Sequence, residues 1–331
     1  MTTLTRIQKN TAGTLRHTFL LDETPTDSST TVTYTVVDAV GAAVTNGNAT
    51  LVSAGTGTYT FTLAAQAALK ACTVTWTGTI SGATTTQTTY AEIVGGFLFS
   101  LAEGRGSDAT LADTSKYPAA DLVAARLEVE AECETICDRA FVPRYERVVL
   151  DGTGTDEILL RHSDPTRSVA EVRTVRSVKM AARADGTFVS FTAAELAALI
   201  VTGDGTLVRT SGDRFLENRA NIIVEYEYGL DRPQPDLVRA ALTRFRTQLN
   251  VNKSGVPDRA SSFTAADGGT FRLDMPGPFK TGVPTVDAAY GRYSRRSTGT
   301  GATGRAVPAS RTLTYSPQIT SMFHRGRGRS W

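Results

Sequence analysis

Threonine alternates with apolar residues along much of the first 93 residues, and this two-residue period restricts the fold more than any other feature. Examples are Thr31–Val36, Thr58–Leu63 and Thr73–Ile80. In a β-strand, alternate side chains point to opposite faces, and β-branched threonine suits the solvated face of a pleated sheet. Several short strands at this spacing predict an antiparallel β-sandwich over residues 1–93.

The predicted sandwich resembles an immunoglobulin-like domain, with Trp76 as its large core aromatic. Cys72 has no cysteine partner in this segment, so the disulfide that usually joins the two sheets is absent. We therefore expect Cys72 to be a small buried side chain and His17, on the apolar side of its strand, to be a core histidine. The segment carries nine charges and 27 threonines, which is typical of a contact or display surface.

A long amphipathic helix is predicted after Pro118, because proline is favoured at the first helical position. Apolar residues recur at steps of three and four and form one face, consisting of Leu122, Ala125, Val129, Cys133, Ile136 and Ala140. The charged side chains of the same stretch are expected mostly off that face; they are Arg126, Glu128, Glu130, Glu134 and Asp138. Cys133 and Cys137 are neighbours on the helix, and since no further ligands lie nearby, we expect them to pack rather than bind metal.

The following residues alternate between strand and turn patterns. Strands are predicted at Glu146–Leu150, Glu157–Arg161 and Asn221–Tyr228. Asp-Gly pairs predict tight hairpin turns at residues 151–152, 185–186, 204–205 and 267–268. A second helix is expected after Pro233 and Pro235. Two helices that bracket a hairpin-rich insert predict a small α+β domain over residues 94–256.

Charge is distributed unevenly along the chain, although the net charge is only +2. Residues 94–287 sum to −5, whereas residues 288–331 contain eight arginines and no acidic residue. Residues 257–331 are rich in Gly, Ser, Thr and Pro, so they bury too little surface to order alone. We predict an extended basic C-terminal arm that orders on a partner. The fold class is thus α+β and multidomain, with a sandwich, a helical domain and an arm.

Several classes of function are not supported by the residue patterns. His162-Ser163-Asp164 contains the residue types of a catalytic triad, but adjacent residues cannot aim at one another as a triad requires. Three histidines and three cysteines make a metal centre or a disulfide framework improbable. The longest apolar stretch, residues 94–102, is far shorter than the roughly 20 residues of a membrane span. We therefore expect no enzyme, no catalytic residues, no metal, no cofactor and no membrane contact.

Two segments carry a family resemblance. Residues 118–150, with Cys137–Arg144 (CDRAFVPR) at the end of the helix, resemble the head-to-tail connector (adaptor) proteins of long-tailed actinobacteriophages. So do residues 281–293, which include Thr281–Ala288 (TGVPTVDA), Arg292 and Tyr293. The resemblance covers residues 94–296. It implies a dodecameric ring beneath the portal vertex that extends the DNA channel and joins the capsid vertex to the tail.

The resemblance also implies a set of partners. These are the portal protein, a tail-side completion or stopper protein and other copies of the chain. The N-terminal sandwich, which is an addition to the family pattern, is expected on the outer rim of the ring, where it either contacts the major capsid protein or stays exposed. Genomic DNA would pass without tight binding, which an acidic body favours. The chain would be made in the host cytoplasm and reside in the virion, at the head-tail interface. The arm would dock into the portal through apolar and arginine side chains, namely Leu313, Tyr315, Met322, Phe323, Arg325, Arg327, Arg329 and Trp331.

Two other classes of function remain open from the residues alone. The Arg-rich tail is compatible with a nucleic-acid binder, which predicts binding that weakens steeply with salt. The sandwich is compatible with a carbohydrate-binding or cell-surface adhesin, which predicts that residues 1–93 bind cells or glycans by themselves. Within the virion, a neighbouring tail-completion protein is the alternative to the adaptor.

Overall fold

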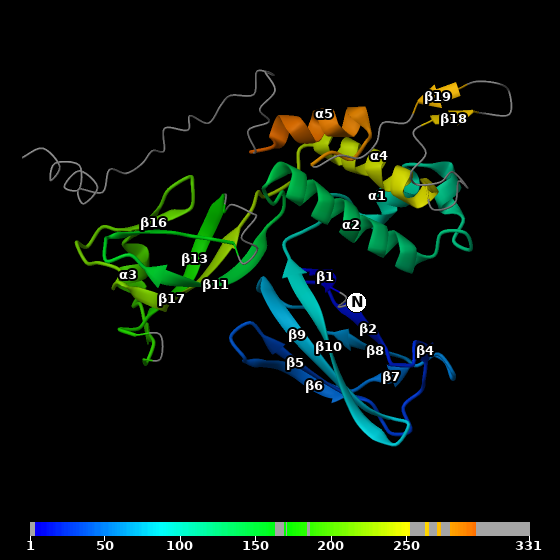
Figure 1. Ribbon diagram of the computed structural model, residues 1–331, viewed down its shortest axis with the longest axis horizontal. Helices are drawn as coiled ribbons and strands as arrows, with labels where there is room; N and C mark the ends of the chain where they lie inside the picture. Colours follow the sequence, from blue (N-terminus) through cyan, green and yellow to red (C-terminus); the bar gives the residue numbers. More distant parts are fainter. Residues whose placement is uncertain are drawn as a thin grey trace, which may run out of the picture.

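The fold is described from a computed structural model that describes residues 4–162, 169, 171–183, 186–251, 262–264, 270–272 and 279–295. It confirms a mixed α+β structure, rich in sheets and with few helices. Figure 1 shows an N-terminal β region below a layer of helices, with a second β region at the side of that layer. The boundaries after residues 93 and 256 stay predictions.

The N-terminal β region contains ten strands: β1 (Leu4–Gln8), β2 (Gly13–Thr18), β3 (Leu20–Leu21), β4 (Thr24–Pro25), β5 (Thr33–Asp38), β6 (Ala43–Asn48), β7 (Thr50–Leu51), β8 (Thr58–Leu63), β9 (Lys70–Ile80) and β10 (Ala83–Val94). One sheet has the order β1-β10-β9-β5-β6, and another has the order β2-β8-β7. The predicted antiparallel pattern is wrong for β1, which pairs with β10 in parallel. Both strands run in the same direction, so that Gln8 lies opposite Val94.

Apolar side chains from both sheets form one core, as the alternation predicts. Trp76 is fully buried at its centre, 5.2 Å from the ring of Phe61 between centroids. Its indole Nε1 donates a hydrogen bond of 2.9 Å to Thr89 Oγ1. Cys72 is buried and free, and burial raises the pKa of its thiol to about 11. The immunoglobulin-like classification of this region stays a prediction.

The helical layer consists of α1 (Leu101–Gly106), the 3-10 helix η1 (Ala109–Ala112), α2 (Ala119–Cys137), α4 (Pro235–Val251) and α5 (Pro284–Tyr293). These elements share one hydrophobic core. Helix α5 lies inside the range predicted as an extended arm, and for these residues that prediction is wrong. Val286 and Tyr290, one helical turn apart, are both fully buried in the core. None of the described helices is long and apolar enough to cross a membrane.

The second β region contains β11 (Arg144–Gly152), β12 (Glu157–Leu159), β13 (Val172–Met180), β14 (Val189–Ser190), β15 (Leu199–Val201), β16 (Thr206–Arg209) and β17 (Asn218–Tyr228), with helix α3 (Ala193–Ala197). Its sheets have the orders β11-β17-β13-β14 and β12-β16-β15, and they share a core. A separate short hairpin pairs β18 (Ser262–Thr264) with β19 (Thr270–Arg272).

Of the predicted Asp-Gly turns, residues 204–205 form the turn between β15 and β16, where Gly205 has a φ of 85°. Residues 185 and 267–268 lie outside the described residues. At residues 151–152 the prediction is wrong, because β11 runs through Gly152 and pairs with β17. Glycine is required here because two backbone segments approach closely: a Cβ at position 152 would lie 1.7 Å from the carbonyl oxygen of Leu216.

Gly152→Ala is therefore expected to destabilise the protein by about 3 kcal/mol, the upper part of the range for overpacking. The obstacle is a backbone carbonyl, which moves only if the strand moves. Gly203→Ala is the matched control, because nothing lies within 4 Å of the added Cβ. Urea unfolding measures both changes, and equal losses for the two variants would show that the close approach does not matter.

Candidate functional site

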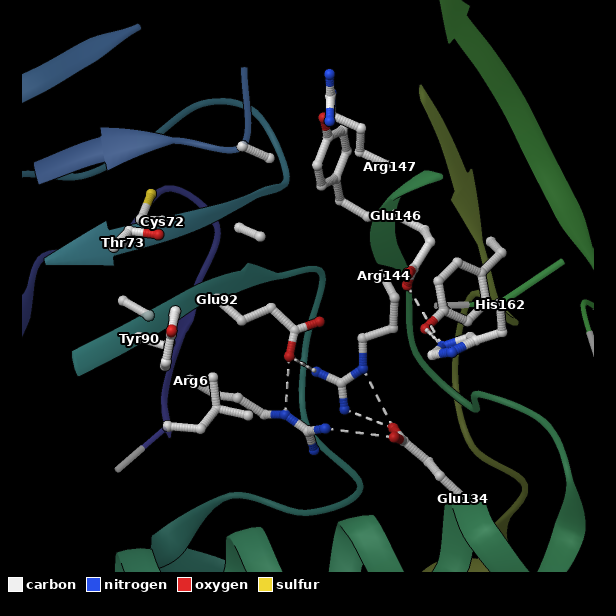
Figure 2. Close-up of a pocket in the computed structure, with 16 residues that line it drawn as sticks. Arg6, Cys72, Thr73, Tyr90, Glu92, Glu134, Arg144, Glu146, Arg147 and His162 are labelled. Atoms are coloured by element: carbon white, nitrogen blue, oxygen red, sulfur yellow. Dashed lines mark hydrogen bonds and ion pairs between the residues drawn. The ribbon is translucent and has the colours of Figure 1, made fainter. Parts of the chain in front are cut away.

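Five charged side chains meet where the N-terminal β region contacts the helical layer. We call Arg6, Glu92, Glu130, Glu134 and Arg144 the junction cluster. They come from β1, β10, α2 and β11, so the cluster joins elements far apart in the chain; Arg6 and Glu134, for example, are separated by 128 residues. Figure 2 shows two guanidinium groups side by side between the carboxylates of Glu92 and Glu134.

Local structure explains why these side chains converge. Arg6 lies directly opposite Glu92 in the parallel pairing of β1 with β10. Glu130 and Glu134 are four residues apart on α2 and therefore share one side of the helix. Arg144 is the first residue of β11, and the chain before it is held by a 2.8 Å hydrogen bond from the backbone N–H of Gly95 to the Pro143 carbonyl.

Each arginine bridges the two regions. Arg6 Nε lies 3.0 Å from Glu92 Oε2, while its Nη1 lies 3.1 Å from Glu130 Oε2 and its Nη2 3.3 Å from Glu134 Oε2. Arg144 Nη2 lies 2.6 Å from Glu134 Oε1, and its Nη1 lies 3.7 Å from Glu92 Oε2. The second oxygen of Glu130 accepts a hydrogen bond of 2.9 Å from the backbone N–H of Leu98.

The cluster is almost entirely removed from water. The exposed fractions of the side chains are 1% for Arg144, 1% for Glu130 and 4% for Glu134. Burial lowers the pKa of Arg144, but the carboxylates, Glu134 first, outweigh it and hold the pKa above its ordinary value. Burial raises the pKa of Glu130, and the two arginines only partly oppose this. Removing any one of these side chains would therefore leave its partners buried without an opposite charge.

A sixth charge completes the balance of the cluster. Arg126, one helical turn before Glu130, is 8% exposed, and its guanidinium lies 3.5 Å from the ring centroid of Phe97. Burial lowers the pKa of Arg126, while the nearby Glu130 opposes that shift. With Arg126 included, three arginines face three glutamates.

An open cavity of about 480 Å³ lies against the cluster. Its lining residues include Ala71 and Tyr145, and Figure 2 shows Tyr90 of the N-terminal β region on the side opposite His162. His162 Nε2 lies 3.3 Å from Glu146 Oε2 and 3.0 Å from the hydroxyl of Tyr228. The partners Ser163 and Asp164 of the predicted loop lie outside the described residues.

Arg126, Glu130 and Glu134 lie off the apolar face of α2, as predicted. They are nevertheless buried, because the N-terminal β region covers that second face. The spacing of Arg126, Glu130 and Glu134 at four-residue steps marks one continuous charged stripe on the helix. Together with Arg6, a lone charge in an alternating strand, this stripe is the signal that could have revealed the cluster.

The cysteines behave as expected for packing side chains. Cys133 and Cys137 are both buried in the helical core, and the thiol of Cys137 lies 3.5 Å from the carbonyl oxygen of Tyr290. Burial raises the pKa of Cys133.

His17 is half-buried against Phe19, with ring centroids 4.8 Å apart. Among the described residues, no group of three His, Cys, Asp or Glu side chains is arranged to hold a metal ion.

The eight side chains predicted to dock into the portal lie outside the described residues. These are Leu313, Tyr315, Met322, Phe323, Arg325, Arg327, Arg329 and Trp331. Their role stays a prediction.

The junction cluster fixes the N-terminal β region against α2, and we call this arrangement the clamp. Both central arginines contact carboxylates from the N-terminal β region and from α2, so moving either region leaves buried charges without partners. A second contact lies beside it, where Arg176 Nη1 of β13 donates a hydrogen bond of 2.6 Å to the carbonyl of Leu69. The N-terminal β region is therefore held in one orientation by the other two regions.

Comparison with solved structures finds three matching chains. The chain is similar to a chain of a structure described as "Neck of native GTA particle computed with C12 symmetry", with a TM-score of 0.35 and 16% sequence identity over 59% of this chain and 93% of that chain. No protein-family model and no curated protein matches the sequence. A TM-score of this size does not establish a shared fold.

Proposed function

We propose that this chain is a structural protein of a phage-like virion, a head-to-tail adaptor rather than an enzyme. One observation carries the proposal: the two segments that resemble the connector family pack against each other. Cys137 Sγ of the first segment donates a hydrogen bond of 3.5 Å to the carbonyl of Tyr290 in the second, and just after that segment the backbone N–H of Arg295 donates one of 3.0 Å to the carbonyl of Cys137. Segments separated by about 150 residues thus belong to one helical core, as a shared family origin requires.

In this proposal the helical layer and the second β region form a dodecameric ring below the portal. The ring extends the DNA channel, and DNA passes through it without tight binding. A tail-side completion or stopper protein binds its other end. The N-terminal β region lies on the outer rim, where it contacts the major capsid protein, and the buried clamp supports this role because a rim element must keep its orientation.

The basic arm docks into the portal, and its deletion provides the test. Removing residues 297–331 is expected to abolish portal binding in a pull-down, because the arginines and apolar anchors of the arm are lost. The truncation begins after the last described residue, Arg295, so every described helix and strand is retained.

A matched pair of full-length variants separates specific docking from overall charge. Arg325→Ala/Arg327→Ala is expected to weaken portal binding at least tenfold, whereas Arg305→Ala/Arg311→Ala, which removes the same charge from the part of the arm before Leu313, is expected to bind nearly as wild type. Equal losses for both pairs would indicate nonspecific attraction. Unchanged binding of the truncated chain would refute docking through the arm.

A further inference from the structure

The sheet formed by β12, β16 and β15 has apolar side chains on both faces, and we call it the insert sheet. Its inner face contributes Ile158 and Leu207, which are buried in the core of the second β region. On its outer face, Leu159 is 50% exposed and Ile200 is 53% exposed. An antiparallel sheet with one solvated face ordinarily carries polar side chains there.

The strand register places the outer apolar residues together. Ile200 and Glu157 both pair with Val208, and directly paired residues of antiparallel strands lie on the same face. Leu159 follows on the same strand two residues after Glu157. The outer face therefore presents Ile200, Val208 and Leu159 as one patch rather than as scattered apolar residues.

An acidic side chain borders this patch. Glu157, the first residue of β12, is exposed on the outer face opposite Val208. Within the part of the chain that the structure describes, its carboxylate forms no ion pair. An apolar centre with an unpaired acidic edge is the pattern of a protein interface, in which the apolar part is covered and the rim is polar.

The same chain carries a complementary basic surface at the beginning of α4. Arg232 and Arg239 are exposed there, and neither forms an ion pair with another described residue. Arg292 of α5 lies at the first turn of α4, where its Nη1 is 2.6 Å from Asp236 Oδ2. This surface belongs to the helical layer and not to the insert sheet, so one chain displays two different and complementary surfaces.

We infer that the outer face of the insert sheet packs against the beginning of α4 of a second copy, with Glu157 facing Arg232 and Arg239. Because the two surfaces differ, the contact is heterologous, and its repetition closes a ring when the rotation between copies is a whole fraction of a turn. The inference rests on the proposed ring and identifies the contact that builds it. Charge complementarity selects a second copy as the occupant, and the apolar patch supplies the buried area.

Charge reversal tests the contact on the full-length chain. Glu157→Arg and Arg232→Glu/Arg239→Glu are each expected to weaken self-association at least tenfold, measured by sedimentation velocity and by counting rings in electron micrographs. Mixing the two variants is expected to restore rings, because each contact in an alternating ring then joins opposite charges. Placing all three substitutions in one chain is expected to restore them too.

The control is Glu23→Arg, which reverses an exposed charge between β3 and β4 in the N-terminal β region. It is expected to assemble as wild type. Thermal unfolding identifies a variant that fails to fold, and rescue by mixing cannot arise from misfolded chains. Rings that survive both reversals, or reversals that mixing does not rescue, would overturn the contact and leave the adaptor role intact. A wild-type chain that forms no ring, alone or with its portal, would instead refute the proposed function.

Discussion

Arg144→Met is expected to lower the free energy of unfolding by about 3–5 kcal/mol, the usual loss when one partner of a buried ion pair is removed. Methionine fills much of the arginine volume, so the loss is electrostatic in origin. Glu134, 4% exposed, would lose its 2.6 Å contact, and Glu130 would lose one of its two cations. Urea unfolding of the full-length chain measures the effect.

Arg244→Met is the matched control for this substitution. Arg244 binds Glu132 with both carboxylate oxygens, at 2.7 and 3.0 Å, but the two side chains are 16% and 28% exposed. A solvated ion pair contributes about 0–1 kcal/mol, so the control variant is expected to lose little. Similar losses of unfolding free energy for Arg144→Met and Arg244→Met would show that burial does not increase the contribution of the junction cluster to stability.

The loss of unfolding free energy in Arg144→Met should also depend on pH. The pKa of Glu130 in the folded protein is raised by burial, above the value of about 4.3 for an exposed glutamate. Its contribution to stability is present in full below the unfolded-state pKa and is lost as the pH rises through the folded-state pKa. Removing Arg144 raises the folded-state pKa further. The difference between variant and wild type should therefore be largest near neutral pH and shrink towards about pH 4.

Local patterns predict those elements whose structure depends on near neighbours in the chain. The alternating threonines predict the strands around Trp76, because the β-strand is the regular secondary structure whose side chains repeat every two residues. The three-and-four spacing from Leu122 to Ile136 predicts α2 and its buried face, which the helical core confirms. The helix after Pro235 follows from the same reasoning.

Local patterns are insufficient where elements far apart in the chain decide the outcome. Glu134 appears solvated on a helical wheel, and only the docking of β1, 128 residues away, turns it into a buried partner of Arg6. The Asp-Gly pair at Gly152 predicts a hairpin turn, but glycine is needed there because the backbone of Leu216, distant in the chain, approaches closely. Helix α5 was included in the arm because its apolar residues are few, yet Val286 and Tyr290 fill a site prepared by α2 and α4.

Trp76→Ala is expected to lower the free energy of unfolding of the N-terminal β region by about 3–5 kcal/mol, as for other buried aromatic residues that are replaced by alanine. The indole is fully buried and contacts both sheets, so the cavity it leaves cannot collapse without moving one sheet against the other. The junction cluster holds this region to α2, and we expect its contacts to be lost together with the core. Differential scanning calorimetry of the full-length chain measures the shift.

Two further variants separate the parts of this effect. Trp76→Phe keeps most of the aromatic volume but leaves the buried Thr89 hydroxyl, 6% exposed, without its indole donor, and is expected to cost about 1–3 kcal/mol. Val52→Ala shortens an apolar side chain that is 53% exposed in the same region, and is expected to change stability by less than about 0.5 kcal/mol. If Trp76→Ala proved no more harmful than Val52→Ala, Trp76 could not be the centre of a core shared by two sheets.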